Sequence, residues 1–443
     1  MTEQNIIRDL GDGLVLRRAA TEDVDELVAF NGNIHKEEGE EKPDEFVAAW
    51  VRDLMSKPHP TLKVDDFTVV VDTKTGKIIS SLNLIPQTWS YAGVEFGVGR
   101  PELVGTDPGY RRRGLIRAQF EVIHQWSAAR GHKMQAITGI PYYYRQFEYE
   151  MGLALGGGRI GYLPHIPKLK DDEAEKYMFR PAVSEDIPLI MQVYEGTARR
   201  SLVSCVRDAA IWQYELTGKS ESTRANYQMI ETLEKEPVGF LALASKLWKP
   251  VLNVWGYELI PEISWLDVTP SVIRYLEKIG QEYADKKEKI EFQGYNFNLG
   301  AEHPVYDVLP ERMPLIAKPY AWYVRLPDLP DFLKHISPVL EGRLADSPLV
   351  GHTGDLKLSF FRSGVKLSFA KGKLKEVEAW MPEIAEEGDV LFPDLTFLRV
   401  LLGYTSFAEL EKIFADCYAR NDHGRALMPV LFPKQASNVW MVG

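Results

Sequence analysis

The sequence is poor in cysteine and has no clustered histidine. Only two of its 443 residues are cysteines, Cys205 and Cys417, and they lie far apart without metal-site spacing. This usage fits a reducing compartment and excludes a disulfide framework, so both are expected to be buried thiols. The nine histidines include no HExxH pattern and no paired ligand spacing, so the sequence predicts no metal site.

Long apolar runs and net positive charge are missing as well. No apolar run approaches the length of about 18 residues that a membrane helix needs, and no basic segment leads into an apolar one at the N-terminus. The formal charge is −11 and the pI is near 5.5. Such a surface repels nucleic-acid phosphates and suits cationic small molecules. We therefore expect a cytoplasmic protein without a membrane span or a nucleic-acid partner.

The length of the chain predicts more than one domain. With 443 residues and 45% hydrophobic content, the chain exceeds what one core organises, which favours two to three domains. Three glycines at 156–158 and the mixed, charged stretch 164–176 mark one boundary. The composition changes again after 319–326. These breaks predict three segments, namely residues 1–165, 166–325 and 326–443.

A basic turn stands between a predicted strand and a predicted helix. The strand Pro101–Thr106 is followed by Asp-Pro-Gly, by Arg111, Arg112 and Arg113, and by Gly114, and helical spacing begins at Leu115. The first N–H groups of a helix have no partner within it and bind phosphate oxygens well. Arginines add positive charge there, and glycine lets a phosphate approach the backbone. Taken alone, the turn is either a solvated basic turn or a phosphate-binding loop.

Two further stretches have both a structural and a functional interpretation. The aromatic run Gly139–Tyr149 follows the predicted strand His132–Thr138, and its three adjacent tyrosines are either packing aromatics or contain a general acid. Between two predicted helices, acids gather at Glu37, Glu38, Glu40, Glu41, Asp44 and Glu45. This acidic run is either a solvated face or a rim that attracts an amine.

The order of elements and the basic turn resemble the GNAT superfamily of N-acetyltransferases over roughly the first 165 residues. Its acetyl-CoA loop has the signature Gln or Arg, any two residues, Gly, any residue, Gly or Ala. Arg111 and Gly114 match this signature, while Ile116 stands where Gly or Ala is usual. The run YRRRGLIRA looks most like the enhanced intracellular survival (Eis) type. The resemblance implies an α+β fold with mixed sheets and acetyl-CoA as acyl-donor substrate.

The resemblance also implies which residues act. Tyr144, three residues before Phe147, corresponds to the general acid, although Glu148 replaces a usual glycine. The base in Eis-type chains is the terminal carboxylate, here that of Gly443, and His35, Glu37 or Glu38 acting through water are its rivals. The implied cofactor contacts are Val104, Gly105, Thr106, Arg111, Arg112, Arg113, Gly114, Leu115, Ile116, Arg117, Gly139 and Ile140.

An internal repeat predicts a second GNAT-like domain. The run RRAATEDV that starts at Arg17 recurs as RPAVSEDI from Arg180. Aligned on Pro108 and Pro270, Ile273 to Tyr275 stand opposite the three arginines and Leu276 stands opposite Gly114, so this copy is expected to be degenerate. The final segment alternates as strands and then turns helical, which is similar to a sterol-carrier-protein-like domain.

Two functions from different classes follow. The first is an acetyl-CoA-dependent N-acetyltransferase that acts on a primary amine of a small cationic acceptor, for example aminoglycoside-like or polyamine-like, and the resemblance implies a closed homo-oligomer such as a hexamer. The second is a non-catalytic protein that senses acetyl-CoA and binds an apolar ligand in its last domain. Arg111 to Gly114 together with Tyr144 favour the enzyme.

Overall fold

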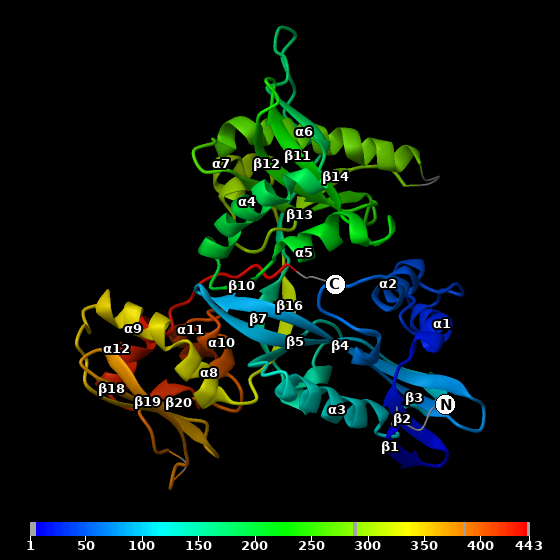
Figure 1. The fold of residues 1–443 in the computed structure, drawn as a ribbon. Coiled ribbons are helices and arrows are strands. Elements are labelled where there is room, and N and C mark those ends of the chain that lie inside the picture. The colour runs from blue at the N-terminus through cyan, green and yellow to red at the C-terminus, as the bar shows by residue number, and fades with distance from the viewer. Residues whose placement is uncertain (1–5, 287–289, 385, 441–443) are drawn as a thin grey trace.

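The computed structural model describes residues 6–286, 290–384 and 386–440, which form three β-sheets with helices packed against them (Figure 1). We call the three parts the N-terminal, middle and C-terminal units. In Figure 1 the N-terminal unit is blue to cyan, the middle unit is green, and the C-terminal unit is yellow to red. No helix within the described ranges is long and apolar enough to cross a membrane.

The sheet of the N-terminal unit is mixed. Its strand order is β1-β2-β3-β4-β5-β6-β16-β7, with β10 paired to β4. All pairs are antiparallel except β5 with β6. The strands are β1 (Ile6–Gly11), β2 (Leu14–Arg18), β3 (Phe67–Asp72), β4 (Lys77–Tyr91), β5 (Val94–Thr106), β6 (Met134–Ile137), β7 (Glu150–Leu155), β10 (Val203–Cys205) and β16 (Tyr320–Arg325).

Alternating side chains place helices on both faces of this sheet. Val69 and Val71 of β3 pack with α1 (Val24–Ile34) and α2 (Glu45–Ser56). Val70 faces the opposite side and packs with α3 (Leu115–Ala129). Successive residues of a strand point to opposite faces, so one short apolar strand holds both helical layers.

The middle unit repeats this plan. Its sheet has the order β15-β8-β14-β13-β12-β11-β9, and α6 packs on one face and α4 on the other. Arg180 is paired with Asp186 at 2.6 Å as Arg17 is paired with Asp23 at 2.7 Å, each at the start of a helix. The elements are β8 (Gly158–Tyr162), β9 (Tyr177–Pro181), β11 (Asn226–Thr232), β12 (Pro237–Leu243), β13 (Val251–Leu259), β14 (Gly294–Phe297), β15 (Leu315–Ala317), α4 (Ile187–Arg200), α5 (Ala209–Gln213), α6 (Trp265–Asp285) and α7 (Pro304–Val308).

The register predicted for the second copy of the basic turn differs from the structure. Pro270 lies inside α6, whereas Pro108 lies in a short 3₁₀ turn before α3. The reason is an earlier helix start, since the side chain of Ser264 caps α6 by accepting from the N–H of Asp267. The turn before α6 is therefore the stretch 260–264, which contains neither arginine nor glycine.

The C-terminal unit packs against the N-terminal unit. Phe332 of α8 lies edge-on to Tyr91 and Phe96, at ring-centroid distances of 6.1 and 5.2 Å. The sheet order is β19-β18-β17-β20-β21. The elements are α8 (Leu329–His335), α9 (Ser337–Ala345), β17 (Gly354–Ser359), β18 (Gly364–Ala370), β19 (Lys373–Trp380), β20 (Val390–Leu391), α10 (Phe397–Leu401), α11 (Phe407–Ile413), β21 (Tyr418–Ala419) and α12 (Asp422–Leu431).

The first two predicted segments exchange strands. β8 precedes the predicted boundary at residue 165 but pairs in the middle sheet, and β16 precedes the boundary at 325 but lies between β6 and β7 of the N-terminal sheet. A break in sequence composition is thus not the same as a break between sheets. The first helices of the C-terminal unit, α8 and α9, are separated at Ile336.

The last described stretch of the chain joins the units. In Figure 1 this red segment leaves the C-terminal unit and passes along β10, between the other two units. The N–H of Leu202 donates to Ala436 at 3.0 Å, and the indole of Trp322 donates to the carbonyl of Val439 at 3.3 Å. Trp440 packs in the core of the middle unit beside Trp212. The chain thereby ties the N-terminal sheet to the middle unit.

Candidate active site

A separation of two parallel strands opens the N-terminal sheet. The β5–β6 ladder pairs Val98 with Met134 and Gly99 with Gln135 and extends no further among the described residues. Farther along β5, its register with β4 shifts and Leu103 has a φ of 54°. This β-bulge redirects the strand before Val104. Backbone at the end of β5 is therefore available beside the gap.

The basic turn follows that strand, as predicted. Asp107 caps it by accepting from the N–H of Gly109 at 2.8 Å, and Gly114 is the N-cap of α3 with a φ of 75°. A Cβ at Gly114 would meet open space, so its backbone conformation rather than crowding within the chain requires glycine. The first turn of α3 leaves unpaired N–H groups that suit an anion.

The arginines of the turn are not equivalent. Arg113 is paired with Asp12 at 2.9 Å, and Arg117 donates to Gln146 at 3.2 Å. The Nε of Arg111 is 3.4 Å from the carbonyl of Thr106. Arg112 is exposed, has a φ of 63°, and has no side-chain partner among the described residues. Arg112 is therefore the arginine most available to a phosphate.

One cavity of about 800 Å³ brings the predicted site residues together. We call it the donor groove. It is bordered by the end of β5, the basic turn, and the residues after β6, and His35 and Glu102 line it as well. All the predicted cofactor residues and Tyr144 lie along it, namely Val104, Gly105, Thr106, Arg111, Arg112, Arg113, Gly114, Leu115, Ile116, Arg117, Gly139, Ile140 and Tyr144.

Tyr144 is the buried member of the tyrosine run. It is 3% exposed, whereas Tyr142 is 73% exposed. A Cβ at Gly139 would lie 3.1 Å from the Tyr144 hydroxyl, and the φ of Gly139 is 137°, so close approach and backbone both require glycine there. Burial and the nearby carboxylate of Glu102 raise the pKa of Tyr144 well above its usual value. This hydroxyl keeps its proton at neutral pH and can donate it.

A second cavity of about 570 Å³ adjoins the donor groove. We call it the acceptor pocket. It lies between the N-terminal and middle units, with Trp50 of α2, Trp255 of β13 and Trp440 among its walls. Glu102 and Thr138 line both cavities. An acyl donor in one cavity and an acceptor in the other would therefore meet beside these two residues.

Glu102 is the functional candidate that sequence reasoning missed. Its Oε1 accepts from Arg100 at 2.7 Å and from the hydroxyl of Thr138 at 3.2 Å, and its side chain is 12% exposed. A carboxylate at this junction can bind an ammonium group. The available signal was a carboxylate within the predicted strand Pro101–Thr106, two residues before Val104.

The residues predicted as alternative general bases lie in different places relative to the donor groove. His35 lines the donor groove, and burial lowers its pKa, an effect that Glu102 and Asp44 oppose. Glu37 and Glu38 are exposed on the loop after α1. Gly443 lies outside the described residues. Trp440 is held by Arg207, whose guanidinium stacks 4.3 Å from its ring centroid and donates to its carbonyl at 2.9 Å.

Comparison with known proteins gives a family match for part of the chain and a likeness in fold for most of it. Residues 15–152 match the model of the acetyltransferase (GNAT) domain family, and no curated protein matches the sequence. The fold is similar to a GCN5-related N-acetyltransferase from Kribbella flavida, with a TM-score of 0.63, 16% identity, and coverage of 96% of this chain and 97% of that chain. The fold is also similar to that of a probable N-acyltransferase from Enterococcus faecalis V583, with a TM-score of 0.63 and 13% identity. The match covers 96% of this chain and 97% of that chain.

Eis1 from Mycobacterium abscessus is also similar in fold, with a TM-score of 0.56, 12% identity, and coverage of 96% of this chain and 98% of that chain. At these identities the likeness concerns the fold. The mixed α+β fold class is confirmed. The prediction of an acyltransferase is confirmed by the family match of residues 15–152. Residues 15–152 of this chain form an acetyltransferase domain of the GNAT type.

Proposed function

We propose that this protein transfers the acetyl group of acetyl-CoA to a primary amine of a small acceptor. The observation that carries the proposal is the meeting of the donor groove and the acceptor pocket at Glu102 and Thr138, with Tyr144 on the wall of the donor groove. Such a junction holds two reactants side by side, which replaces a bimolecular encounter by a positioned one.

The donor is held by backbone and by charge. The amides at the start of α3, with Arg111 and Arg112, bind the pyrophosphate of acetyl-CoA. The backbone after the bulge, from Val104 to Thr106, binds the pantetheine arm and polarises the thioester carbonyl. Gly139 and Ile140 form the opposite wall. Each predicted cofactor residue named here is thus assigned to the part of acetyl-CoA that it contacts.

The bound ammonium first loses one proton to solvent and becomes a neutral amine, and the transfer then requires two further proton movements. The neutral amine attacks the thioester carbon, so a nitrogen–carbon bond forms and the carbon–sulfur bond breaks. The departing thiolate takes the proton of the Tyr144 hydroxyl and leaves as coenzyme A thiol. The amine nitrogen gives up a proton to a base, and that proton later restores Tyr144 through solvent. The raised pKa of Tyr144 keeps its hydroxyl protonated at neutral pH, so the group is available as a proton donor and not as a base.

We assign the binding of the acceptor ammonium to Glu102 and keep the terminal carboxylate of Gly443 as the proposed base. Glu102 is already paired with Arg100 and Thr138, which suits orientation of an ammonium. A terminal carboxylate has a reference pKa of about 3.3–3.7 and is ionised at neutral pH. Trp440, anchored by Arg207 and lining the acceptor pocket, supports this role of the chain end.

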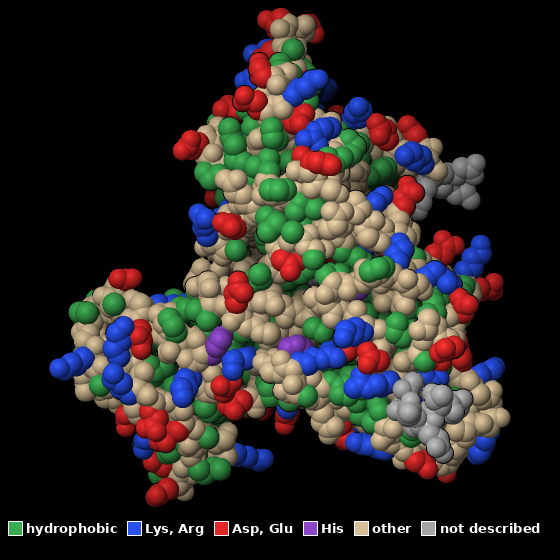
Figure 2. All heavy atoms as spheres, viewed as in Figure 1, with side chains coloured by type: hydrophobic (Ala, Val, Ile, Leu, Met, Phe, Trp, Pro, Cys, Tyr) green, Lys and Arg blue, Asp and Glu red, His purple; other side chains and the backbone are tan. Residues whose placement is uncertain are grey.

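The charged side chains that line the acceptor pocket, and not the net charge of the chain, indicate which acceptor it binds. On the face shown in Figure 2, acidic and basic side chains are interspersed, so the net charge of −11 is not gathered in one patch on that face. The acceptor pocket has carboxylates at Glu102 and Glu215 and cations at Arg100, Lys219 and Lys318. The carboxylates suit the amine of the predicted cationic acceptor. The lysines suit oxygen atoms elsewhere on the same molecule.

The organisation of the chain is part of the proposal. We infer a catalytic segment 1–165, a second and degenerate GNAT-like segment 166–325, and a sterol-carrier-protein-like segment 326–443, assembled as a homo-oligomer in the cytoplasm. The repeated Arg–Asp pair and helix layers of the middle unit support the second segment. The absence of arginine and glycine from residues 260–264 supports its degeneracy.

Thiol release from acetyl-CoA in the presence of a panel of primary amines tests this function. Glu102→Gln removes the negative charge and keeps the shape, and it should raise the KM for the amine at least tenfold while acetyl-CoA still binds. Thr138→Val is the matched control for loss of a hydrogen bond to Glu102 alone. Bound acetyl-CoA with no thiol release for any amine would favour the non-catalytic sensor.

A further inference from the structure

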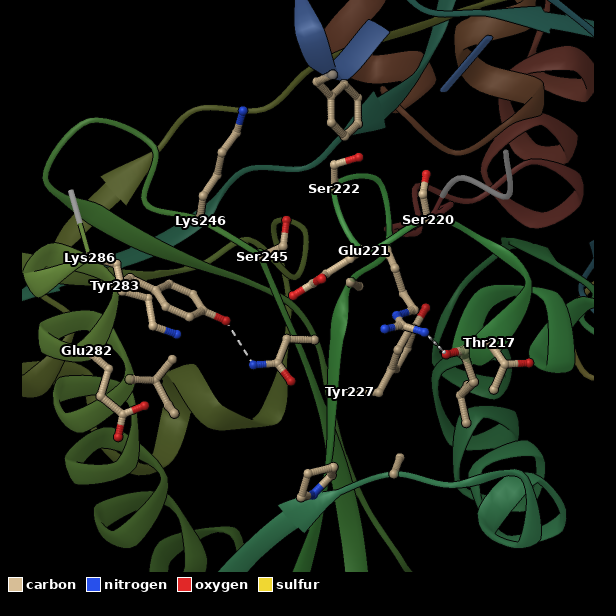
Figure 3. Close-up of a pocket in the computed structure, with 18 of the residues that line it drawn as sticks. Thr217, Ser220, Glu221, Ser222, Tyr227, Ser245, Lys246, Glu282, Tyr283 and Lys286 are labelled. Carbon is tan, nitrogen blue, oxygen red and sulfur yellow. Dashed lines mark hydrogen bonds between the residues drawn. The ribbon is translucent and has the colours of Figure 1, made fainter. Parts of the chain in front are cut away.

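A cleft larger than the acceptor pocket lies on the middle unit. Its volume is about 1210 Å³, above the range of about 300–1000 Å³ that is usual for small-molecule pockets. Figure 3 shows Lys246 and Glu282 on one side and Thr217 and Ser220 on the other, with the side chain of Glu221 pointing into the space between them. We call it the outer cleft.

The outer cleft and the acceptor pocket are neighbours. Both are lined by Phe46 of α2 and by Ala225. One segment, 215–225, forms a wall of each: Glu215, Lys219 and Thr223 line the acceptor pocket, and Thr217, Ser220 and Ser222 line the outer cleft. Since the acceptor pocket also meets the donor groove at Glu102, the three cavities follow one another in a row.

The wall between the two cavities is fixed to the N-terminal unit. Asp53 of α2 is buried and accepts hydrogen bonds from the N–H of Ser220 at 2.8 Å and from the hydroxyls of Ser220 and Thr223 at 2.6 Å each. Lys57 is paired with the other oxygen of this carboxylate at 2.9 Å. The two units therefore hold this wall, and the edge at Phe46 and Ala225 that both cavities share, in one geometry.

The lining of the outer cleft is polar and of both charges. Carboxylates stand at Glu45, Glu185, Glu221 and Glu282, and cations at Arg224, Lys246 and Lys286. Within the described ranges none of these seven side chains has an ion-pair partner, and the guanidinium of Arg224 donates to the carbonyl of Leu216 at 3.1 Å. Hydroxyls add donors and acceptors, among them Ser222 and Ser245, which have no hydrogen-bond partner among the described residues. This pattern matches a chain with carbonyls, amides and charges of both signs.

We propose that the acceptor is a peptide whose primary amine enters the acceptor pocket at Glu102 and whose following residues lie in the outer cleft. The inference rests on the proposed acetyl transfer and adds the substrate class. A peptide supplies the amide groups for the hydroxyls and the charged side chains for the unpaired acids and bases. Each added residue in the cleft contributes contacts that a small amine lacks.

Two peptide series test the proposal. The first has one, two, four and eight residues with glycine at the N-terminus and serine, glutamate and arginine after it, so the terminal amine is the only primary amine. The second has a blocked N-terminus and a single central lysine. We expect kcat/KM to rise at least tenfold from the two-residue to the eight-residue peptide in at least one of the two series. Calorimetry with coenzyme A present should show the same order of affinity.

Ser245→Trp places an indole ring in the outer cleft and narrows it. We expect this change to lower, toward one, the ratio of kcat/KM for the eight-residue peptide to kcat/KM for the two-residue peptide. Ser363→Trp makes the same change at an exposed turn of the C-terminal unit and should keep the ratio of the unmodified protein. Far-ultraviolet circular dichroism and unfolding midpoints of both variants control for folding.

The outcomes distinguish the proposal of a peptide acceptor from the proposal of acetyl transfer. If small amines such as spermidine or an aminoglycoside are acetylated and no peptide series shows a length dependence, the peptide acceptor is wrong and acetyl transfer stands. If no amine is acetylated, acetyl transfer is wrong, and calorimetry alone decides the outer cleft. Equal affinity for two and eight residues, or an unchanged ratio in Ser245→Trp, overturns the proposal.

Discussion

The Tyr144 hydroxyl is the smallest group on which the proposed chemistry depends. Tyr144→Phe keeps the ring that packs against Phe120 and Tyr323 and removes only the proton donor. We expect acetyl-CoA binding to persist and kcat to fall about 10²–10⁴-fold, the usual contribution of general acid catalysis. Calorimetry and steady-state kinetics measure the two effects.

Tyr142→Phe is the control, because Tyr142 is exposed and lies outside the donor groove. A larger loss of kcat in this variant than in Tyr144→Phe would show that the acid is the wrong member of the tyrosine run.

Three half-buried histidines predict how stability depends on pH. Burial lowers the pKa values of His59, His124 and His132 from 6.5 to about 4. Between these values the unfolded chain binds more protons than the folded one, so stability falls as the pH falls from about 6.5 toward 4. The loss is on the order of 1–3 kcal/mol for each histidine.

Urea unfolding at pH 7, 6 and 5 checks this. His124→Gln cannot take up that proton, so we expect its free energy of unfolding to depend less on pH than that of the unmodified protein. An equal dependence would mean that His124 is not buried in its neutral form.

At the scale of elements, the strand, turn and helix around the basic turn decide donor binding. Arg112→Ala removes an unpaired cation and Gly114→Val forces a β-branched residue to a φ of 75° at the N-cap of α3. We expect each to weaken acetyl-CoA binding at least tenfold, as measured by calorimetry. Only one site per chain is expected.

The matched control lies on α6 of the middle unit. Arg274 is paired there with Glu175 through two of its nitrogens, at 2.5 and 2.7 Å. Arg274→Ala should reduce stability and leave acetyl-CoA affinity unchanged. A titration with two donor sites per chain would contradict a degenerate second copy.

At the scale of the whole molecule, the chain end links the units and is the proposed base. Deleting Val442 and Gly443, or adding a few residues after Gly443, moves the terminal carboxylate and leaves the donor groove intact. We expect acetyl-CoA binding to persist and turnover to collapse. Full activity of a C-terminally extended protein would exclude the terminal carboxylate and leave Glu102 or His35 as the base.

Arg207→Met tests whether the contact between Arg207 and Trp440 positions the chain end for proton transfer or only stabilises the fold. The buried guanidinium contacts the ring and the carbonyl of Trp440, so its loss should release the last residues from the middle unit. We expect lower kcat with little change in acetyl-CoA affinity. The pH profile of kcat should also change if the anchor positions a titrating group, and a merely structural contact would leave that profile unchanged.

The sequence by itself determined the local elements and the donor side of the candidate site. Asp107, the arginines and Gly114 act within one short stretch, so their order predicts a turn, a helix start and an anion site without distant contacts. The helix from Leu115 follows from its apolar spacing in the same way. The position of the tyrosine run after β6 likewise follows from local order.

Only the tertiary structure decided the acceptor side. Glu102 becomes a junction residue because β5 and β6 separate and α2, the middle unit and Trp440 close around the gap, and these come from distant parts of the chain. The exchange of β8 and β16 between sheets, and the register of the second copy, depend on pairings and a helix cap that composition does not encode. Long-range packing sets these features, because similar apolar strands can pair in either sheet at little local cost.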